Sequence, residues 1–231
     1  LEYLSTVRIK CIAPAYSQSN VRVSFEVSLN GQDFTNSGLE FTFYNDYTKA
    51  KFTSIEPTSG PDTGGSSIKV YGESFAGLLN EDEFLCQFYP SDPTLQPKTV
   101  PAGFQDFGNN KTAVICNTPG GWTSGTKADI RITFDGQNYF DTGFDFYFYK
   151  IVGLHPSSGP SDGGEAIEVI GSGFQNSTDV KCMLNKVEYK PIDIYQDKIL
   201  CPMPISPYGK NFTGSVDFSV TLNGIDWKDF K

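Results

Sequence analysis

The 231 residues include 18 Lys+Arg and 27 Asp+Glu, a formal net charge of −9 that argues against sequence-independent binding to nucleic acid or anionic membrane. A single histidine, His155, leaves little scope for histidine-based catalysis or zinc binding, and no run of about 18 apolar residues is present to span a membrane. Frequent Gly (23), Pro (14), Phe (19) and Tyr (12) are typical of many short strands joined by turns.

Three segments share a C-x-x-P motif, then a strand of alternating apolar and polar residues, then a tight turn. The motifs are Cys11–Pro14, Cys116–Pro119 and Cys201–Pro204, the strands are 21–29, 128–134 and 216–222, and the turns are Asn30-Gly31, Asp135-Gly136 and Asn223-Gly224. The alternation predicts half-buried antiparallel strands. Asn-Gly and Asp-Gly tolerate positive φ at both central positions, so we expect type I′ hairpin turns.

A second repeat has two copies, residues 54–75 and 153–174, which match without gaps at an offset of 99. Both contain S-G-P-x-x-G-G followed by an I-x-V-x-G strand. The glycines superficially resemble a phosphate-binding loop, but a strand follows and no helix N-terminus is available for a phosphate. We therefore interpret them as turn glycines.

Alternating segments at 39–43 and 144–148 look like the closing strands of two domains. No stretch shows the 3.6-residue period of an amphipathic helix, so we predict an all-β fold of tandem immunoglobulin-like β-sandwiches. The expected domains are the C-terminal half of one at 1–49, a complete one at 50–149, and one lacking its last strand at 150–231. Closing strand 144–148 leads into the next domain with almost no linker, which predicts a stiff junction.

The order S-G-P-x-x-G-G, I-x-V-x-G, C-x-x-P and Asn-Gly resembles the IPT/TIG domain. This immunoglobulin-like family includes domains of plexins, scatter-factor receptors and Rel-type transcription factors, and forms tandem arrays on large surface proteins. The resemblance covers essentially the whole chain. The DNA-binding branch fits poorly because the chain is acidic.

The resemblance implies disulfides Cys86–Cys116 and Cys182–Cys201. Cys11 aligns with the second member of each pair, so its partner is expected upstream of residue 1. Paired cysteines indicate an oxidising compartment, and hence an extracellular or cell-surface location. The alternatives are buried free thiols in a cytosolic protein or, less favoured because no C-x-x-C is present, a zinc site.

Three N-glycosylation sequons begin at Asn110, Asn176 and Asn211, each in a predicted turn or loop. Their side chains are either glycan acceptors, as in a secreted protein, or unmodified polar loop residues.

No catalytic constellation, metal site or cofactor motif is visible. His155 is interpreted as a polar residue at a domain junction, and the acidic run at residues 80–83 lacks the spacing of a calcium loop. We expect a non-catalytic extracellular structural protein, a rigid glycosylated rod or filament segment. Its expected partners are other copies of itself, neighbouring repeats and N-linked glycans, without nucleic acid or membrane contact. The alternatives are a plexin-like receptor or adhesion ectodomain and, third, spacer domains of a carbohydrate-processing enzyme.

Overall fold

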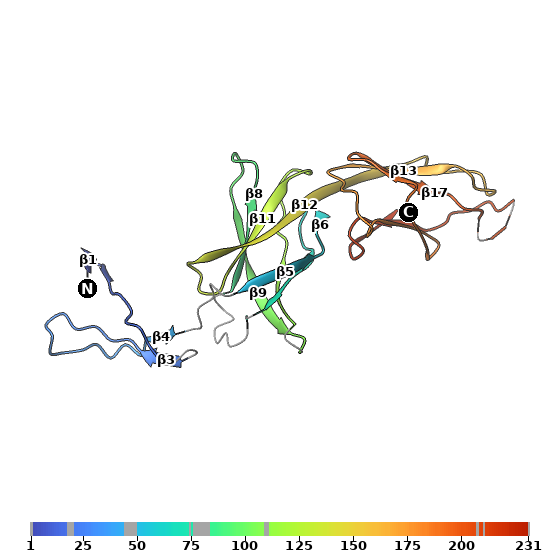
Figure 1. Cartoon of the computed structure of the whole chain (residues 1–231). Coiled ribbons are helices and arrows are strands. Elements are labelled where there is room, and N and C mark those ends of the chain that lie inside the picture. The colour runs from blue at the N-terminus through green and yellow to red at the C-terminus, as the bar shows by residue number, and fades with distance from the viewer. Residues whose placement is uncertain are drawn as a thin grey trace. The chain divides into compact units, whose positions relative to one another are not determined.

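The structure is a computed structural model that describes residues 2–17, 21–43, 50–73, 75, 84–108, 111–206, 208–209 and 211–230. All regular elements in these ranges are strands (Figure 1), which confirms the predicted all-β class. The chain divides into two compact units, one of residues 1–49 and 75–79 and the other of residues 50–74 and 80–231.

The first unit consists of two antiparallel strand pairs. Strand β1 (Glu2–Ser5) pairs with β2 (Arg8–Lys10), and β3 (Val21–Ser24) pairs with β4 (Glu40–Phe43). None of the described side chains of residues 1–49 is buried, because two-stranded ribbons cannot enclose a core by themselves. The predicted strand 21–29 is correspondingly shorter than expected.

The second unit contains two successive β-sandwiches. In the first, one sheet has the order β5 (Lys51–Glu56), β7 (Ser67–Glu73), β10 (Thr112–Asn117) and β9 (Lys98–Asp106). The other sheet has β8 (Leu85–Pro90), β11 (Lys127–Thr133), β12 (Tyr139–His155) and β6 (Ser59–Pro61). Strand β9 belongs to both sheets, pairing with β8 in its first half and with β10 in its second.

In the second sandwich, one sheet consists of the end of β12, β13 (Ala166–Ser172), β17 (Lys198–Pro202) and β16 (Asp193–Ile194). The other has the order β15 (Val187–Tyr189), β14 (Lys181–Leu184), β18 (Phe218–Thr221) and β19 (Trp227–Phe230). Inward-facing residues of both sheets, among them Val169, Ile199 and Val220, form its core.

The second sandwich includes a strand, β19, that corresponds to the beginning of β12 in the first sandwich. Strand β19 pairs antiparallel with β18, with Thr221 opposite Trp227. Thr133 lies opposite Tyr139 in the same way at the start of β12. Strand β19 therefore corresponds to Tyr139–Thr142 of β12, which precede the predicted closing strand 144–148. Alternation alone placed the closing strand at 144–148 because the paired segment before it, Tyr139–Asp141, is less regular in sequence.

The predicted type I′ turns are wrong. Gly31, Gly136 and Gly224 have positive φ, but the Asn or Asp before each of them does not. Pairing of Thr133 with Tyr139 closes a five-residue loop, not a two-residue turn. A two-residue turn with positive φ at both positions occurs instead at Asn185-Lys186, between β14 and β15.

Candidate functional site

The three repeat loops share one conformation, which an Asn or Asp at the first position sets up. In residues 134–138, Asp135 Oδ1 accepts hydrogen bonds from the backbone N–H groups of Gln137 (2.9 Å) and Asn138 (2.7 Å), and Asn138 Nδ2 donates to Asp135 Oδ2 at 2.7 Å. Such side-chain-to-backbone bonds allow Asn and Asp to organise turns locally. The sequence pattern [N/D]-G-x-[D/N] indicates this loop conformation.

In the first copy of the loop, the same hydrogen bonds form with Asn at the first position and Asp at the fourth. Asn30 accepts from the N–H groups of Gln32 and Asp33, and Asn30 Nδ2 donates to Asp33 Oδ2 at 2.7 Å. In the third copy, residues 222–226, Asn223 accepts from the N–H groups of Ile225 (3.0 Å) and Asp226 (2.8 Å). We call this third copy the junction loop.

The junction loop uses these polar groups to contact the preceding sandwich. Asn223 is 5% exposed, and its Nδ2 donates to the carbonyl of Ser59 at 2.8 Å and to Asp226 Oδ2 at 2.7 Å. Asp226 Oδ2 also accepts a hydrogen bond from the Ser66 hydroxyl at 2.5 Å. Ser59 lies within the S-G-P-x-x-G-G motif of the first sandwich and Ser66 directly follows it, so one repeat motif contacts the other across the junction.

A single strand connects the two sandwiches. Up to Tyr149, β12 pairs with β11 and β6, and from Lys150 it pairs with β13. Tyr149 is buried at this change of partners, with its ring 6.4 Å from that of Phe174. Burial, with a smaller contribution from the Asp226 carboxylate, raises the pKa of the Tyr149 hydroxyl well above its ordinary value.

Backbones also approach closely at the junction. A Cβ on Gly173, which has φ of +73°, would lie 2.5 Å from the amide nitrogen of Gly125. The Ser124 and Ser172 hydroxyls are 2.6 Å apart, which is hydrogen-bond distance. The junction therefore combines a continuous strand, a buried polar network and a glycine-dependent backbone contact.

The glycines of the repeated motif bring it against the C-x-x-P segment of the same sandwich. The Gly65 N–H donates to the Thr118 carbonyl at 2.9 Å, and the Gly164 N–H donates to the Met203 carbonyl at 3.0 Å. A Cβ on Gly64 would lie 2.4 Å from the amide nitrogen of Gly120. These residues are turn glycines whose absent side chains allow two loops to pack.

Four of the five cysteines form two disulfides, each connecting the two sheets of one sandwich. Cys86 in β8 is bonded to Cys116 in β10, and Cys182 in β14 is bonded to Cys201 in β17. Cys11 is exposed and free in this structure.

The sequons lie in different settings. Asn176 is exposed in the loop between β13 and β14, and Asn211 is exposed between β17 and β18. The Asn211 N–H donates to the Ser161 hydroxyl at 3.0 Å. Asn110 lies outside the described residues.

Other chemistry-bearing residues are dispersed. His155 is exposed at the end of β12. Among the described residues, no three His, Cys, Asp or Glu side chains are grouped as metal ligands. Over the same ranges, no helix has the length and apolarity to cross a membrane. The acidic run at 80–83 lies outside the described residues.

Comparison with known proteins matches residues 150–229 to the IPT/TIG domain family. Two structures of the plexin A4 extracellular region are similar over 84% of this chain at 15% identity, with TM-scores of 0.40 and 0.43, and the similarity covers 20% and 17% of their chains. The surface glycan-binding protein PbSGBP-B from Prevotella bryantii is similar over 78% of this chain and 41% of its own, at 14% identity and a TM-score of 0.29.

No curated protein matches the chain. The chain spans a fifth or less of the plexin structures and under half of the glycan-binding one. Residues 150–229 carry both repeat motifs on an immunoglobulin-like sandwich closed by the Cys182–Cys201 disulfide. The family match and these motifs therefore identify residues 150–229 as an IPT/TIG domain.

Proposed function

We propose that this protein is a non-catalytic extracellular spacer that holds consecutive immunoglobulin-like domains in one fixed geometry. The observation that carries the proposal is the junction of the second unit, where β12 belongs to both sandwiches and the junction loop bonds to Ser59 and Ser66. A flexible linker has no such pairing. A continuous strand with a satisfied buried polar network resists bending because bending breaks those bonds.

An extracellular location is supported by two features of the chain. Both disulfides connect the two sheets of a sandwich, and disulfides persist in oxidising compartments. Asn176 and Asn211 are exposed in loops, where an N-linked glycan has room to project into water. We further propose neighbouring repeats and copies of this chain as its partners, in a rod or filament.

Rotational diffusion tests the rigidity. We expect ¹⁵N relaxation of the two sandwiches to fit one diffusion tensor in the native protein. Inserting Gly-Gly-Ser between Tyr149 and Lys150 interrupts β12, and the two sandwiches should then tumble separately. The same insertion in the loop 134–138, within one sandwich, is the control and should leave one tensor. Separate tumbling in the native protein would contradict the spacer function.

Secretion provides the second test. Protein produced through a secretory pathway should lose mass on treatment with an N-glycosidase, and free-thiol titration should find no reactive Cys86, Cys116, Cys182 or Cys201. Unchanged mass together with four titratable thiols would contradict the extracellular assignment.

A further inference from the structure

Strands β6 and β12 form a parallel pair, whereas the other strand pairs of the described residues are antiparallel. Strand β6 pairs over all three of its residues, which lie opposite residues 147–149 of β12 (Figure 1). Two backbone hydrogen bonds flank this pairing. The Tyr147 N–H donates to the Thr58 carbonyl at 3.0 Å, and the Asp62 N–H donates to the Tyr149 carbonyl at 2.7 Å. The pair is therefore bonded from residue 58 to residue 62.

These two strands lie where the chain enters and leaves the first sandwich. Strand β5 leads directly into β6, and β12 continues from this pair into its pairing with β13. In a parallel pair, one strand is entered and the other is left at opposite ends of the pair. Tension along the chain therefore slides β6 and β12 past each other, so that the hydrogen bonds between them share the load. In an antiparallel pair loaded at its open end, the bonds break one after another, so the parallel pair should resist extension more.

The β6–β12 pair is shielded from water. Ser59 and Gly60 are buried, and Phe146 and Phe148 of β12 are fully buried. A Cβ on Gly60 would lie 2.8 Å from Cζ of Phe146, so the β6 backbone lies directly against the aromatic core. Water competes for the donor and acceptor of a backbone hydrogen bond, and the bond is stronger in a dry interior of low dielectric constant. Burial therefore adds to the force that is needed to separate β6 from β12.

The Cys86–Cys116 disulfide limits how far the chain can extend once this pair opens. It connects β8 with β10 across a sequence separation of 30 residues. Neither β6 nor β12 lies between the two cysteines in the sequence. When β6 and β12 separate, the chain on either side of the disulfide can be drawn out, whereas the segment that the disulfide encloses cannot extend.

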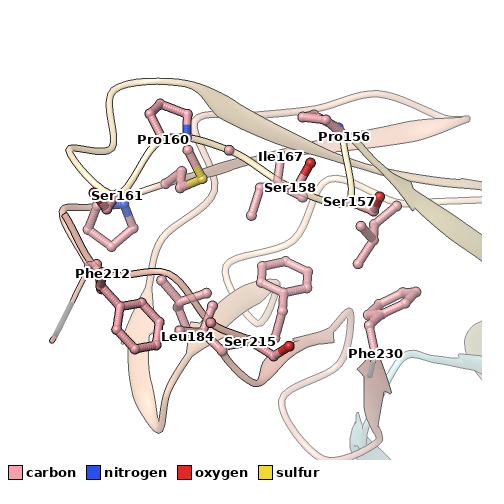
Figure 2. Close-up of a pocket in the computed structure, with 18 residues that line it drawn as sticks. Pro156, Ser157, Ser158, Pro160, Ser161, Ile167, Leu184, Phe212, Ser215 and Phe230 are labelled. Carbon is pink, nitrogen blue, oxygen red and sulfur yellow. The ribbon is translucent and has the colours of Figure 1, made fainter. Parts of the chain in front are cut away.

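The second copy of the S-G-P-x-x-G-G motif makes no parallel pair among the described residues. Figure 2 shows that residues Pro156–Ser161 lie along one side of a pocket of about 550 Å³ in the second sandwich. Resistance to sliding from a parallel pair is therefore assigned to the first sandwich.

We propose that the first sandwich carries tension along the chain, with the β6–β12 pair as its mechanical clamp and the Cys86–Cys116 disulfide as the limit on its extension. Strand β12 transmits the load without a linker, because it leaves the clamp at Tyr149 and pairs with β13 from Lys150. Load bearing rests on the proposed spacer function, since a spacer that fixes its neighbours also transmits the pull between them. The two can fail separately. Separate tumbling of the sandwiches would contradict the spacer function, whereas the clamp is measured within the first sandwich.

Single-molecule pulling on the full chain tests the clamp through the direction of the force. Handles attached to residues 50 and 150, by chemistry that spares the cysteines, load the first sandwich and slide β6 along β12. Handles at residues 101 and 117 lie just outside the paired residues Ala102 and Cys116 and open β9–β10 from its end. We expect the first direction to need the higher force at the same loading rate, because forced unfolding depends on the unfolding barrier. An equal or lower force between residues 50 and 150 would overturn the proposal.

Reduction tests the role of the disulfide in the same measurement. Opening the Cys86–Cys116 bond should lengthen the unfolding step between residues 50 and 150 by about 100 Å, since it frees a separation of 30 residues at about 3.3–3.6 Å each. The force between residues 50 and 150 should stay above that between residues 101 and 117, because the clamp opens before the disulfide is loaded. A step of unchanged length would contradict the limit on extension. Loss of the difference between the two directions would show that the disulfide, and not the clamp, bears the load.

Two proline variants separate the clamp from general stability. Asp62 and Ser91 each follow a proline at the end of a strand, and each donates one backbone hydrogen bond, to the Tyr149 carbonyl at 2.7 Å and to the Lys127 carbonyl at 2.9 Å. Proline has no N–H, so Asp62→Pro removes a bond of the clamp, and the matched control Ser91→Pro removes a bond between β8 and β11.

Asp62→Pro should lower the force between residues 50 and 150 more than Ser91→Pro does, and urea unfolding checks that both variants fold. If Asp62→Pro does not fold, the comparison of the two pulling directions decides the proposal. Equal lowering of the force by the two folded variants would overturn it.

Discussion

Replacing Asn223 with Ala perturbs the junction at one buried side chain. Asn223 is 5% exposed and its side chain takes part in five hydrogen bonds, of which only the one to the Ser59 carbonyl crosses the junction directly. A typical intramolecular hydrogen bond contributes about 1 kcal/mol net, and a buried polar group left without a partner costs about 1–3 kcal/mol. We therefore expect Asn223→Ala to lower the free energy of unfolding by about 2–4 kcal/mol.

The matched control is Asp135→Ala in the loop 134–138. Asp135 makes the corresponding loop bonds to Gln137 and Asn138, and it accepts a hydrogen bond from the Thr133 hydroxyl as Asn223 does from that of Thr221. This control should cost about 1–2 kcal/mol, since it removes local bonds whose backbone donors can turn to water. The difference between the two variants estimates the contribution of the interdomain contact.

Urea unfolding followed by tryptophan fluorescence measures both losses, because Trp122 lies in the first sandwich and Trp227 directly follows the junction loop. A double-mutant cycle of Ser66→Ala with Asp226→Ala should also give a coupling of about 1 kcal/mol or more, as expected for a hydrogen bond to a carboxylate. The reasoning is refuted if Asn223→Ala costs no more than Asp135→Ala and the cycle shows no coupling.

Three further changes have defined outcomes. Replacing Cys86 and Cys116 together with Ala should lower the unfolding free energy by about 3–4 kcal/mol, the chain-entropy value for a separation of 30 residues, and calorimetry measures it; a loss below 1 kcal/mol would contradict this. Burial and the adjacent Asp145 raise the pKa of Asp129, so its protonated form is favoured in the fold and the associated stability is lost as pH rises. Asp129→Asn should therefore stabilise by about 0.2–1 kcal/mol at pH 7 and not below about pH 4, in pH-dependent unfolding. Asn176→Gln should remove one glycan from secreted protein, seen as a lower intact mass, and unchanged mass would show that the site is unoccupied.

Local sequence signals predicted the strands and their faces well where a sandwich is complete. Ala128, Ile130 and Ile132 are buried at alternate positions of β11, as period-two alternation requires. The same pattern at 21–29 yields only the short strand Val21–Ser24, because pairing also needs a partner along the whole length. Alternation specifies which side chains turn inward, but not how far a neighbouring strand extends.

The loops show a second limit of local reasoning. Asn-Gly and Asp-Gly are frequent in two-residue turns, and that preference suggested type I′ geometry. The fourth residue of each loop decides otherwise, since Asp33, Asn138 and Asp226 each bond back to the first residue. The pattern [N/D]-G-x-[D/N] was present in the sequence, and reading it would have predicted the longer loop.

By itself, the sequence determined the all-β class, the repeat motifs and their resemblance to the IPT/TIG domain, because these depend on alternation, turn residues and spacing within one segment. Only the tertiary structure decided that β12 serves two sandwiches, that Asn223 alone among three equivalent loop residues is buried against the preceding domain, and that a pocket remains beside residues 158–160. These depend on which segments meet across long separations, and identical motifs acquire different environments when their neighbours differ.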